Sequence, residues 1–268
     1  MSATALKVFA LLLMFLDHVG EFIPGAPLFL RYFGRLSAPL FMFCSAWGFA
    51  HTSDRRKYLT RLYGFGVGMA VVSMLLNHFF RFNALRSSIT NNFFTTLFLT
   101  WAVVAIIESK DIRLYALFAV WQALAFLLSA LLSELLRIPN FPTILRSYRL
   151  WGSVFGSILV CEGGPLFVTL GVCLYFARSK KPVLIMGYAL FSAGILFLTR
   201  RYGHIPGGPM AYIVPFSDFQ WMMIGALPFM LAYNGQRGKG LKYLFYWFYP
   251  VHIVLLYLLG QWIASMPQ

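Results

Sequence analysis

Three titratable side chains stand close together in the first apolar stretch of the chain, LLLMFLDHVGEF at residues 11–22. Asp17, His18 and Glu21 fall within five positions of one another. Histidine accepts and returns a proton near neutral pH, and a carboxylate beside it orients the ring and raises its basicity. We therefore predict a catalytic site in which His18 is a general base and Asp17 and Glu21 are its acidic partners.

An α-helix through this stretch decides which of these side chains share a face. One stripe of such a helix contains Lys7, His18 and Glu21, whereas Asp17 points about a quarter-turn aside, toward a neighbouring helix. Eleven residues separate Lys7 from His18, which is three turns and about 16 Å of helix. The alternative is that Asp17 and Glu21 only form ion pairs with Arg31 or Arg35 across the first outer loop.

The elements that carry these residues are those of a membrane protein. Hydrophobic residues make up 60% of the 268 positions and charged residues only 11%, whereas a soluble domain is about a quarter charged. Spanning segments in lipid must satisfy their own backbone hydrogen bonds, so they form helices. An ionisable side chain inside such a helix is costly and is a functional candidate for that reason.

Apolar segments separated by polar breaks run from end to end. We expect an all-α integral membrane protein, a bundle of about nine or ten transmembrane helices in one domain over residues 1–268. Residues 150–163 fit either a tenth span or a half-helix, so the sequence predicts a re-entrant or broken segment near 150–165. The nine candidate spans are 3–23, 36–52, 58–80, 91–109, 112–136, 164–178, 182–199, 217–234 and 242–263.

Basic residues in the loops set the expected orientation. Lysines and arginines at Lys7, 54–61, 110–113, 178–181 and 237–242 fall on one side, which we assign with the N-terminus to the cytoplasm. The opposite loops carry arginine alone; guanidinium groups suit phosphate and carboxylate, and the alternative is that they only anchor helix ends at the membrane interface. These are Arg31, Arg35, Arg81, Arg86, Arg137, Arg146, Arg149, Arg200 and Arg201.

Nucleic-acid and metal sites are both disfavoured. The net charge of +14 is explained by basic loops that meet anionic lipid headgroups, so we expect no nucleic-acid partner. No second His or Cys follows His18 at the i+3 or i+4 position, and the three cysteines lack ligand spacing. We expect membrane lipid as a partner and no bound metal.

Polar residues near other span ends are further candidates. His51 precedes Arg55 and Arg56 in a basic segment suited to a phosphorylated ligand. The stretch NNFFTT at 91–96 begins a span with two amides and two hydroxyls, which cap the helix or bond a carbonyl in a cavity. YWFYPVHI places Tyr249 and His252 on nearly the same face of the last span, and His204 falls in a predicted outer loop.

Four stretches of the chain together resemble the TraX family of membrane proteins. They are ALKVFALLLMFLDHVG, RYFGRLSAPLFMFCSAWGFAHTSDRRKYLTRL, NNFFTT and YWFYPVHI, in that order. TraX proteins are known for acetylating the N-terminus of conjugative pilin, and they are similar to the transmembrane acyltransferases that O-acetylate surface glycans. That wider group carries a basic residue eleven positions before a catalytic histidine, and Lys7 and His18 match this spacing.

The resemblance implies acetyl transfer from cytoplasmic acetyl-CoA to an amine or hydroxyl of an acceptor outside, a pilin-like peptide or a surface glycan. It also implies a multi-pass protein of the bacterial cytoplasmic (inner) membrane. His18 would act as the base or carry the acetyl group transiently. We predict acetyl-CoA contacts at Lys7, Arg31, Arg35, His51, Arg55 and Arg56. We predict substrate contacts at Asn91, Asn92, Thr95, Tyr249 and His252.

Two other functions remain open at this point. A proton-coupled transporter or flippase would use Asp17, His18 and Glu21 as a proton relay. Such folds are built from paired, broken helices in two related halves, and we find no internal symmetry of that kind. A scaffold protein of a surface apparatus would not need His18 at all. The acceptor, the acyl chain length and the oligomeric state are not specified by the sequence.

Overall fold

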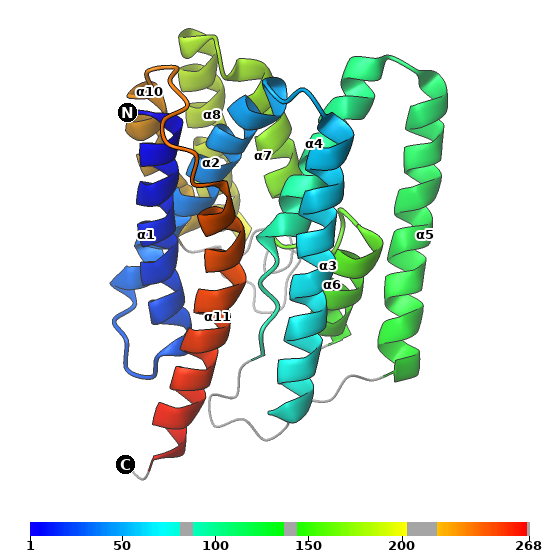
Figure 1. Cartoon of the computed structure of the whole chain (residues 1–268), viewed down its shortest axis with the longest axis vertical. Coiled ribbons are helices and arrows are strands. Elements are labelled where there is room, and N and C mark those ends of the chain that lie inside the picture. The colour runs from blue at the N-terminus through cyan, green and yellow to red at the C-terminus, as the bar shows by residue number, and fades with distance from the viewer. Residues whose placement is uncertain (81–87, 137–143, 203–218, 267–268) are drawn as a thin grey trace. The chain divides into compact units, whose positions relative to one another are not determined.

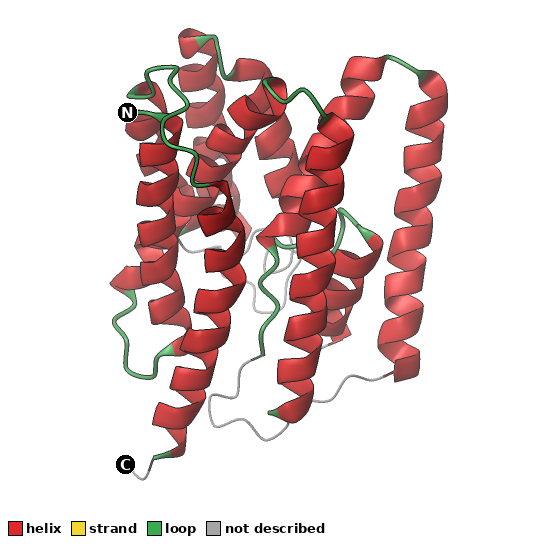
Figure 2. Ribbon diagram, in the orientation of Figure 1, coloured by secondary structure: helices red, strands yellow, loops and turns green. Residues whose placement is uncertain are grey.

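The computed structural model describes residues 1–80, 88–136, 144–202 and 219–266 (Figure 1). Throughout these ranges the chain forms helices and connecting loops, with no β-strand (Figure 2). Arg81, Arg86, Arg137 and His204 of the sequence predictions lie outside the described residues. The chain forms two compact units, residues 1–50 with 173–268 and residues 51–172.

The first unit is built around two helices that run in the same direction. These are α1 (Ala3–Phe22) and α11 (Lys242–Ser265). Aromatic contacts between them appear in the same order on both: Phe15 with Phe248, His18 with His252, and Phe22 with Tyr257. The start of each helix therefore lies at the same end of the unit (Figure 1).

The loop before α11 is fastened to the start of α1. The backbone N–H of Ala3 donates to the carbonyl of Gln236 at 2.8 Å, and the Thr4 hydroxyl donates to the carbonyl of Lys239 at 2.6 Å. Ser2 caps α1 by accepting from the backbone N–H of Ala5 at 3.2 Å. These bonds satisfy helix-end donors and fix where α1 and α11 begin relative to each other.

Helix α2 (Phe29–Ala50) packs antiparallel against α1, and Gly34 lies at the contact. A Cβ atom at Gly34 would stand 2.1 Å from Cγ of Asp17, so only glycine allows this approach. The expected span at 36–52 began seven residues too late, because Gly34 and the turns around it lie inside the helix rather than before it. The rest of the unit contains α8 (Lys181–Tyr202), the 3-10 helix η1 (Gln220–Ala226) and α10 (Leu227–Leu231).

The second unit contains α3 (Arg55–Phe79), α4 (Phe93–Ser109), α5 (Ile112–Leu136) and α6 (Ile144–Phe155). Asp54 caps α3 by accepting from the backbone N–H of Lys57 at 2.8 Å. The side chain of Asn92 does not cap α4, and the carboxylate of Glu162 accepts from the Asn92 backbone N–H in its place. The carboxylate of Glu162, in the turn between α6 and α7, thus lies at the N-terminus of α4, where the helix dipole favours a negative charge.

The predicted break near 150–165 is confirmed. Helix α6 has 12 residues and α7 (Gly164–Ala177) has 14, so each rises about 18–21 Å, less than the hydrocarbon core of about 30 Å. Between them the chain turns through Gly156, whose φ is +73°. Side chains of α5 bind the exposed backbone there: Trp121 donates to the carbonyl of Phe155, and Gln122 to that of Gly156, both at 2.9 Å.

The all-α membrane fold predicted from the sequence is confirmed. Within the described ranges, five helices are long and apolar enough to cross a membrane: α1, α3, α5, α8 and α11. Three shorter apolar helices accompany them, at 93–109, 164–177 and 220–231. With α2 these correspond to the nine predicted spans, although the described part of 217–234 is a 3-10 helix of 7 residues followed by an α-helix of 5. The chain is a multi-pass membrane protein.

Candidate functional site

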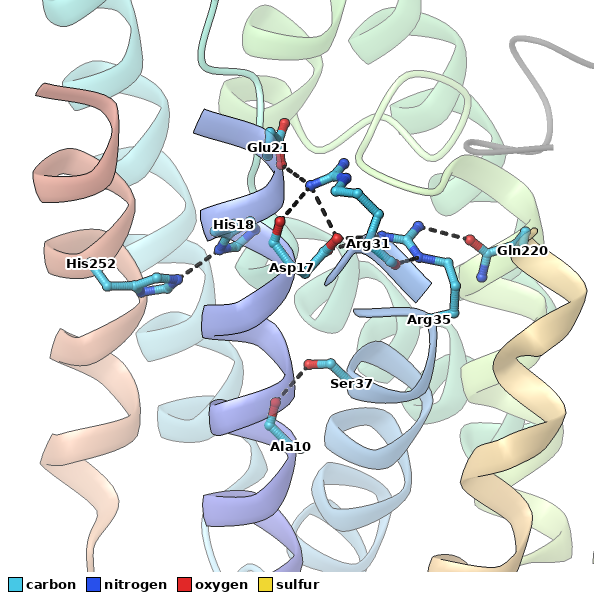
Figure 3. Close-up of polar contacts among 9 residues, drawn as sticks. All are labelled: Ala10, Asp17, His18, Glu21, Arg31, Arg35, Ser37, Gln220 and His252. Atoms are coloured by element: carbon cyan, nitrogen blue, oxygen red, sulfur yellow. Dashed lines mark hydrogen bonds and ion pairs between the residues drawn. The ribbon is translucent and has the colours of Figure 1, made fainter. Parts of the chain in front are cut away.

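A cluster of charged side chains lies between α1 and α2 in the first unit (Figure 3). Nη2 of Arg35 lies 2.9 Å from Oδ2 of Asp17, and Nη1 of Arg31 lies 3.0 Å from Oδ1. Nη1 of Arg31 also donates to Oε2 of Glu21 at 2.9 Å. Two carboxylates and two guanidinium groups therefore balance one another inside the unit, as the alternative interpretation of Asp17 and Glu21 anticipated.

Further hydrogen bonds hold the two arginines in place. Arg35 donates through Nε to the carbonyl of Arg31 at 3.1 Å and through Nη1 to Oε1 of Gln220 at 3.1 Å. Gln220 begins η1 and is 1% exposed. Arg31 and Arg35 were expected in an outer loop, and that expectation is wrong: both are buried in α2. Buried guanidinium groups are stable here because carboxylates of α1 neutralise them.

His18 lies beside the charged cluster and faces α11 instead. Its Nδ1 is 2.7 Å from Nε2 of His252, and both side chains are buried, at 4% exposure each (Figure 3). The ring centroids are 4.9 Å apart with 26° between the planes. Since each nitrogen lies on the rim of its ring, these values place the rings edge to edge, with the hydrogen bond close to both planes. A second imidazole, rather than a carboxylate, is the partner of this His18 nitrogen.

Aromatic rings enclose the two histidines. The ring of Tyr249 lies 6.3 Å from that of His18 and 6.0 Å from that of His252. Phe248 stacks on His252 at 4.6 Å, and Nδ1 of His252 lies 2.6 Å from the Phe248 carbonyl oxygen. The structure thus brings together His18, Tyr249 and His252, which the sequence placed in one predicted site from opposite ends of the chain.

Lys7 lies on the same side of α1 as His18, nearer the start of the helix. Its Nζ is 5.7 Å from the centre of the Phe245 ring of α11, a cation–π contact. The predicted stripe from Lys7 to His18 therefore faces one neighbour, α11, along its length. The predicted contact of Lys7 with acetyl-CoA stays a prediction.

Comparison with known proteins identifies relatives of this chain. The model of the family described as TraX protein matches residues 2–152, which is more than half of the chain. The chain belongs to the TraX family. It is also 29% identical over 273 residues to the "Probable fimbrial assembly protein FimC, serogroup H1" of Dichelobacter nodosus, covering 95% of this chain and 94% of that protein. No solved structure matches it.

The other predicted site residues of this TraX-family protein belong to its second unit. Arg55 pairs with the carboxylate of Glu108, and His51 and Arg56 are exposed. Asn92 donates through Nδ2 to the carbonyl of Gly66 at 2.8 Å, and the Thr95 hydroxyl to that of Ser153 at 3.5 Å. Their predicted contacts with acetyl-CoA or substrate, and that of Asn91, stay predictions.

Sequence reasoning missed two residues that shape the site, Gly34 and Gln220. Gly34 falls just before the predicted span 36–52 and so was not placed in a helix, although a glycine one helix away from an intramembrane aspartate permits close contact. Gln220 gave no local signal, because its role depends on Arg35 at a distance of 185 residues along the chain. In the described part of the TraX-family protein, no group of three or more His, Cys, Asp or Glu is placed to hold a metal ion.

Proposed function

We propose that this TraX-family protein is a membrane acetyltransferase. It moves an acetyl group from cytoplasmic acetyl-CoA to an amine or hydroxyl of an extracytoplasmic acceptor, in the bacterial cytoplasmic membrane and with its N-terminus in the cytoplasm. One observation carries the proposal: His18 is buried in a membrane helix and is bonded to His252, while nearby carboxylates are matched by arginines. A buried histidine that is not neutralised as an ion pair is suited to proton transfer.

The reaction balances with His18 as the general base. The acceptor N–H or O–H gives its proton to His18 as the nitrogen or oxygen attacks the thioester carbonyl, and a new bond to carbon forms. The C–S bond then breaks, and the CoA thiolate takes the proton back from His18. Alternatively, His18 attacks the thioester first and passes the acetyl group to the acceptor. Both routes need an imidazole and no external oxidant or reductant.

Basic residues support an anionic acyl donor. Lys7 shares the α11-facing side of α1 with His18 and lies about 16 Å nearer the end that we assign to the cytoplasm. An ammonium group there suits the phosphates of CoA. Arg31 and Arg35 are poor candidates for this role, because their guanidinium groups already hold Asp17, Glu21 and Gln220.

The acceptor that these relationships favour is a subunit of a surface filament. The Dichelobacter nodosus relative is named as a probable fimbrial assembly protein and aligns over nearly its whole length. The TraX family resemblance points the same way, toward the N-terminal amine of a pilin-like peptide. A surface glycan hydroxyl is the second acceptor class to test.

A proton-coupled transporter is less well supported by the site. Its relay would require Asp17 and Glu21 to gain and lose protons. Both carboxylates are paired with Arg31 or Arg35 at 2.9–3.0 Å, so protonation of either one would break an ion pair that holds α1 against α2. Of the three residues named for the relay, His18 is the one whose hydrogen-bond partner is another histidine and not an arginine.

The test uses purified protein in nanodiscs, with calorimetric titration of acetyl-CoA and a time course of free CoA. We expect saturable binding and a slow release of CoA that a pilin-like peptide accelerates, with the peptide gaining one acetyl group by mass. His18→Gln should reduce the release rate by about 10²–10⁴-fold. His78→Gln, an exposed histidine of α3, is the matched control and should leave the rate unchanged.

Absence of binding at millimolar acetyl-CoA would overturn the acetyltransferase proposal. Equal CoA release by His18→Gln and the wild type would mean that the protein is an acetyltransferase whose reaction does not depend on His18. Either result would turn attention to proton flux in liposomes, measured with the same variants.

A further inference from the structure

His252 makes two hydrogen bonds whose directions can be worked out. Its Nδ1 lies 2.6 Å from the carbonyl oxygen of Phe248, one turn earlier in α11. A carbonyl oxygen has no proton to give, so Nδ1 of His252 must carry the hydrogen and donate it. A neutral His252 ring then has no hydrogen on Nε2, and this nitrogen is an acceptor.

The next bond follows from the first. Nε2 of His252 lies 2.7 Å from Nδ1 of His18, and a bond of this length between two ring nitrogens contains one hydrogen. Because Nε2 of His252 accepts, Nδ1 of His18 must donate. A neutral His18 then carries no hydrogen on Nε2, which leaves that nitrogen with a lone pair.

Neutral rings are expected in this position. Both side chains are buried, at 4% exposure each, and a net charge inside a membrane-spanning unit is costly. The four charges beside them, on Asp17, Glu21, Arg31 and Arg35, sum to zero. The cluster therefore supplies no surplus negative charge that would call for a cationic histidine pair.

We propose that His252 is a positioning residue that holds His18 with its proton on Nδ1, so that Nε2 of His18 is the nitrogen that takes the acceptor's proton. The carbonyl of Phe248, His252 and His18 form a chain in which each member orients the next, as a carboxylate orients a catalytic histidine in other enzymes. When Nε2 of His18 takes the proton, Nε2 of His252 bonds the imidazolium that forms. The catalytic part of this inference rests on the proposed acetyl transfer, whereas the tautomer rests on the geometry alone.

Aromatic pairs between the parallel helices α1 and α11 hold the two histidine rings in their edge-to-edge geometry. Phe15 and Phe248 contact each other one turn before the histidines, and Phe22 and Tyr257 one turn after them. Phe248 also stacks on the His252 ring at 4.6 Å. Both imidazoles are thus fixed from above and below, and rotation away from the hydrogen bond would disturb several rings.

The tautomers can be measured without any substrate. Protein labelled with ¹⁵N-histidine contains five such residues, and His18→Gln and His252→Gln spectra identify the two signals by subtraction. In nanodiscs at neutral pH we expect both rings to be neutral with the hydrogen on Nδ1, and a coupling between Nδ1 of His18 and Nε2 of His252. A cationic pair, or His18 with its hydrogen on Nε2, would overturn the proposal.

Two substitutions of His252 separate positioning from packing. Phenylalanine keeps the ring but accepts no hydrogen bond, so His252→Phe should shift His18 toward the other tautomer and lower kcat for CoA release by about tenfold or more, with KM for acetyl-CoA little changed. Glutamine can accept from His18 and donate to Phe248, so His252→Gln should restore the tautomer and most of the rate. If His252→Phe does not fold, the wild-type spectrum still decides, because a His18 hydrogen on Nε2 or the absence of a coupling to Nε2 of His252 would overturn the proposal.

The two proposals fail in different ways. Expected tautomers in a protein that neither binds nor cleaves acetyl-CoA would refute the acetyltransferase and leave the positioning by His252 intact. Cleavage of acetyl-CoA with unchanged His18 signals in His252→Phe would do the reverse, because His18 would then hold its tautomer without His252.

Discussion

Asp17 is the residue on which the charge balance of the site depends. Arg31 and Arg35 both pair with Asp17, whereas Glu21 pairs with Arg31 and Gln220 accepts a hydrogen bond from Arg35. Buried ion pairs add little net stability, since desolvation offsets most of the attraction, but loss of one partner leaves an uncompensated charge. The role that we assign to Asp17 is therefore to keep α2 and its arginines in place beside His18.

Removing the charge of Asp17 should destabilise the protein strongly. Asp17→Asn leaves the cluster with one surplus positive charge, and we expect a loss of about 3–5 kcal/mol in unfolding free energy. Ser37→Ala is the control in the same helix contact, since its hydroxyl donates to the Ala10 carbonyl at 2.9 Å (Figure 3), and it should cost about 1 kcal/mol. Denaturant unfolding in detergent micelles measures both.

The double variant tests whether charge balance is the cause. Asp17→Asn with Arg35→Gln restores neutrality and leaves Arg31 with Glu21. We expect its loss of unfolding free energy to be smaller than the sum of the losses of the two single variants, by about 1 kcal/mol or more. Strict additivity would mean that the cost of Asp17→Asn comes from lost packing alone.

Among the elements, α2 shows where sequence reasoning stops. Its apolar part, 36–52, was predictable because long hydrophobic runs in lipid form helices. Its first turns were not, because Arg31 and Arg35 count as loop residues until partners on α1 are known. The same holds for Gly34, which is needed because a Cβ atom there would clash with Asp17 at 2.1 Å.

A methyl group at Gly34 should therefore separate α1 from α2. The Asp17 side chain cannot move aside, because two arginines hold it. We expect Gly34→Ala to lower the unfolding free energy by about 1–3 kcal/mol and to reduce any CoA release. Gly187→Ala in α8 is the matched control: nothing lies within 4 Å of the new methyl, and it should be neutral or slightly stabilising. Equal effects of the two changes would contradict the close-contact argument.

Across the whole molecule, the positions of the helices along the chain were predictable from the sequence, whereas the contacts between helices were not. All nine expected spans correspond to helices, and the break near 150–165 is present. The spacing of Lys7 and His18 is local and was readable. The bond from His18 to His252 joins residues 234 positions apart, and no periodicity of the chain relates them. Such pairs become visible only when the first and last helices are placed side by side.

The parallel course of α1 and α11 makes a prediction about the two ends of the last helix. Lys239 is bonded to the start of α1 and is in the basic segment 237–242, whereas Ser265 ends α11 on the far side; both are exposed. In a variant lacking Cys44, Cys161 and Cys173, an impermeant maleimide should label Ser265→Cys in intact cells and Lys239→Cys only after permeabilisation. Labelling of both from the same side would contradict the prediction, because α11 would then not cross the membrane. The reversed pattern would keep the parallel arrangement but place the start of α1, with Lys7, outside the cell and away from cytoplasmic acetyl-CoA.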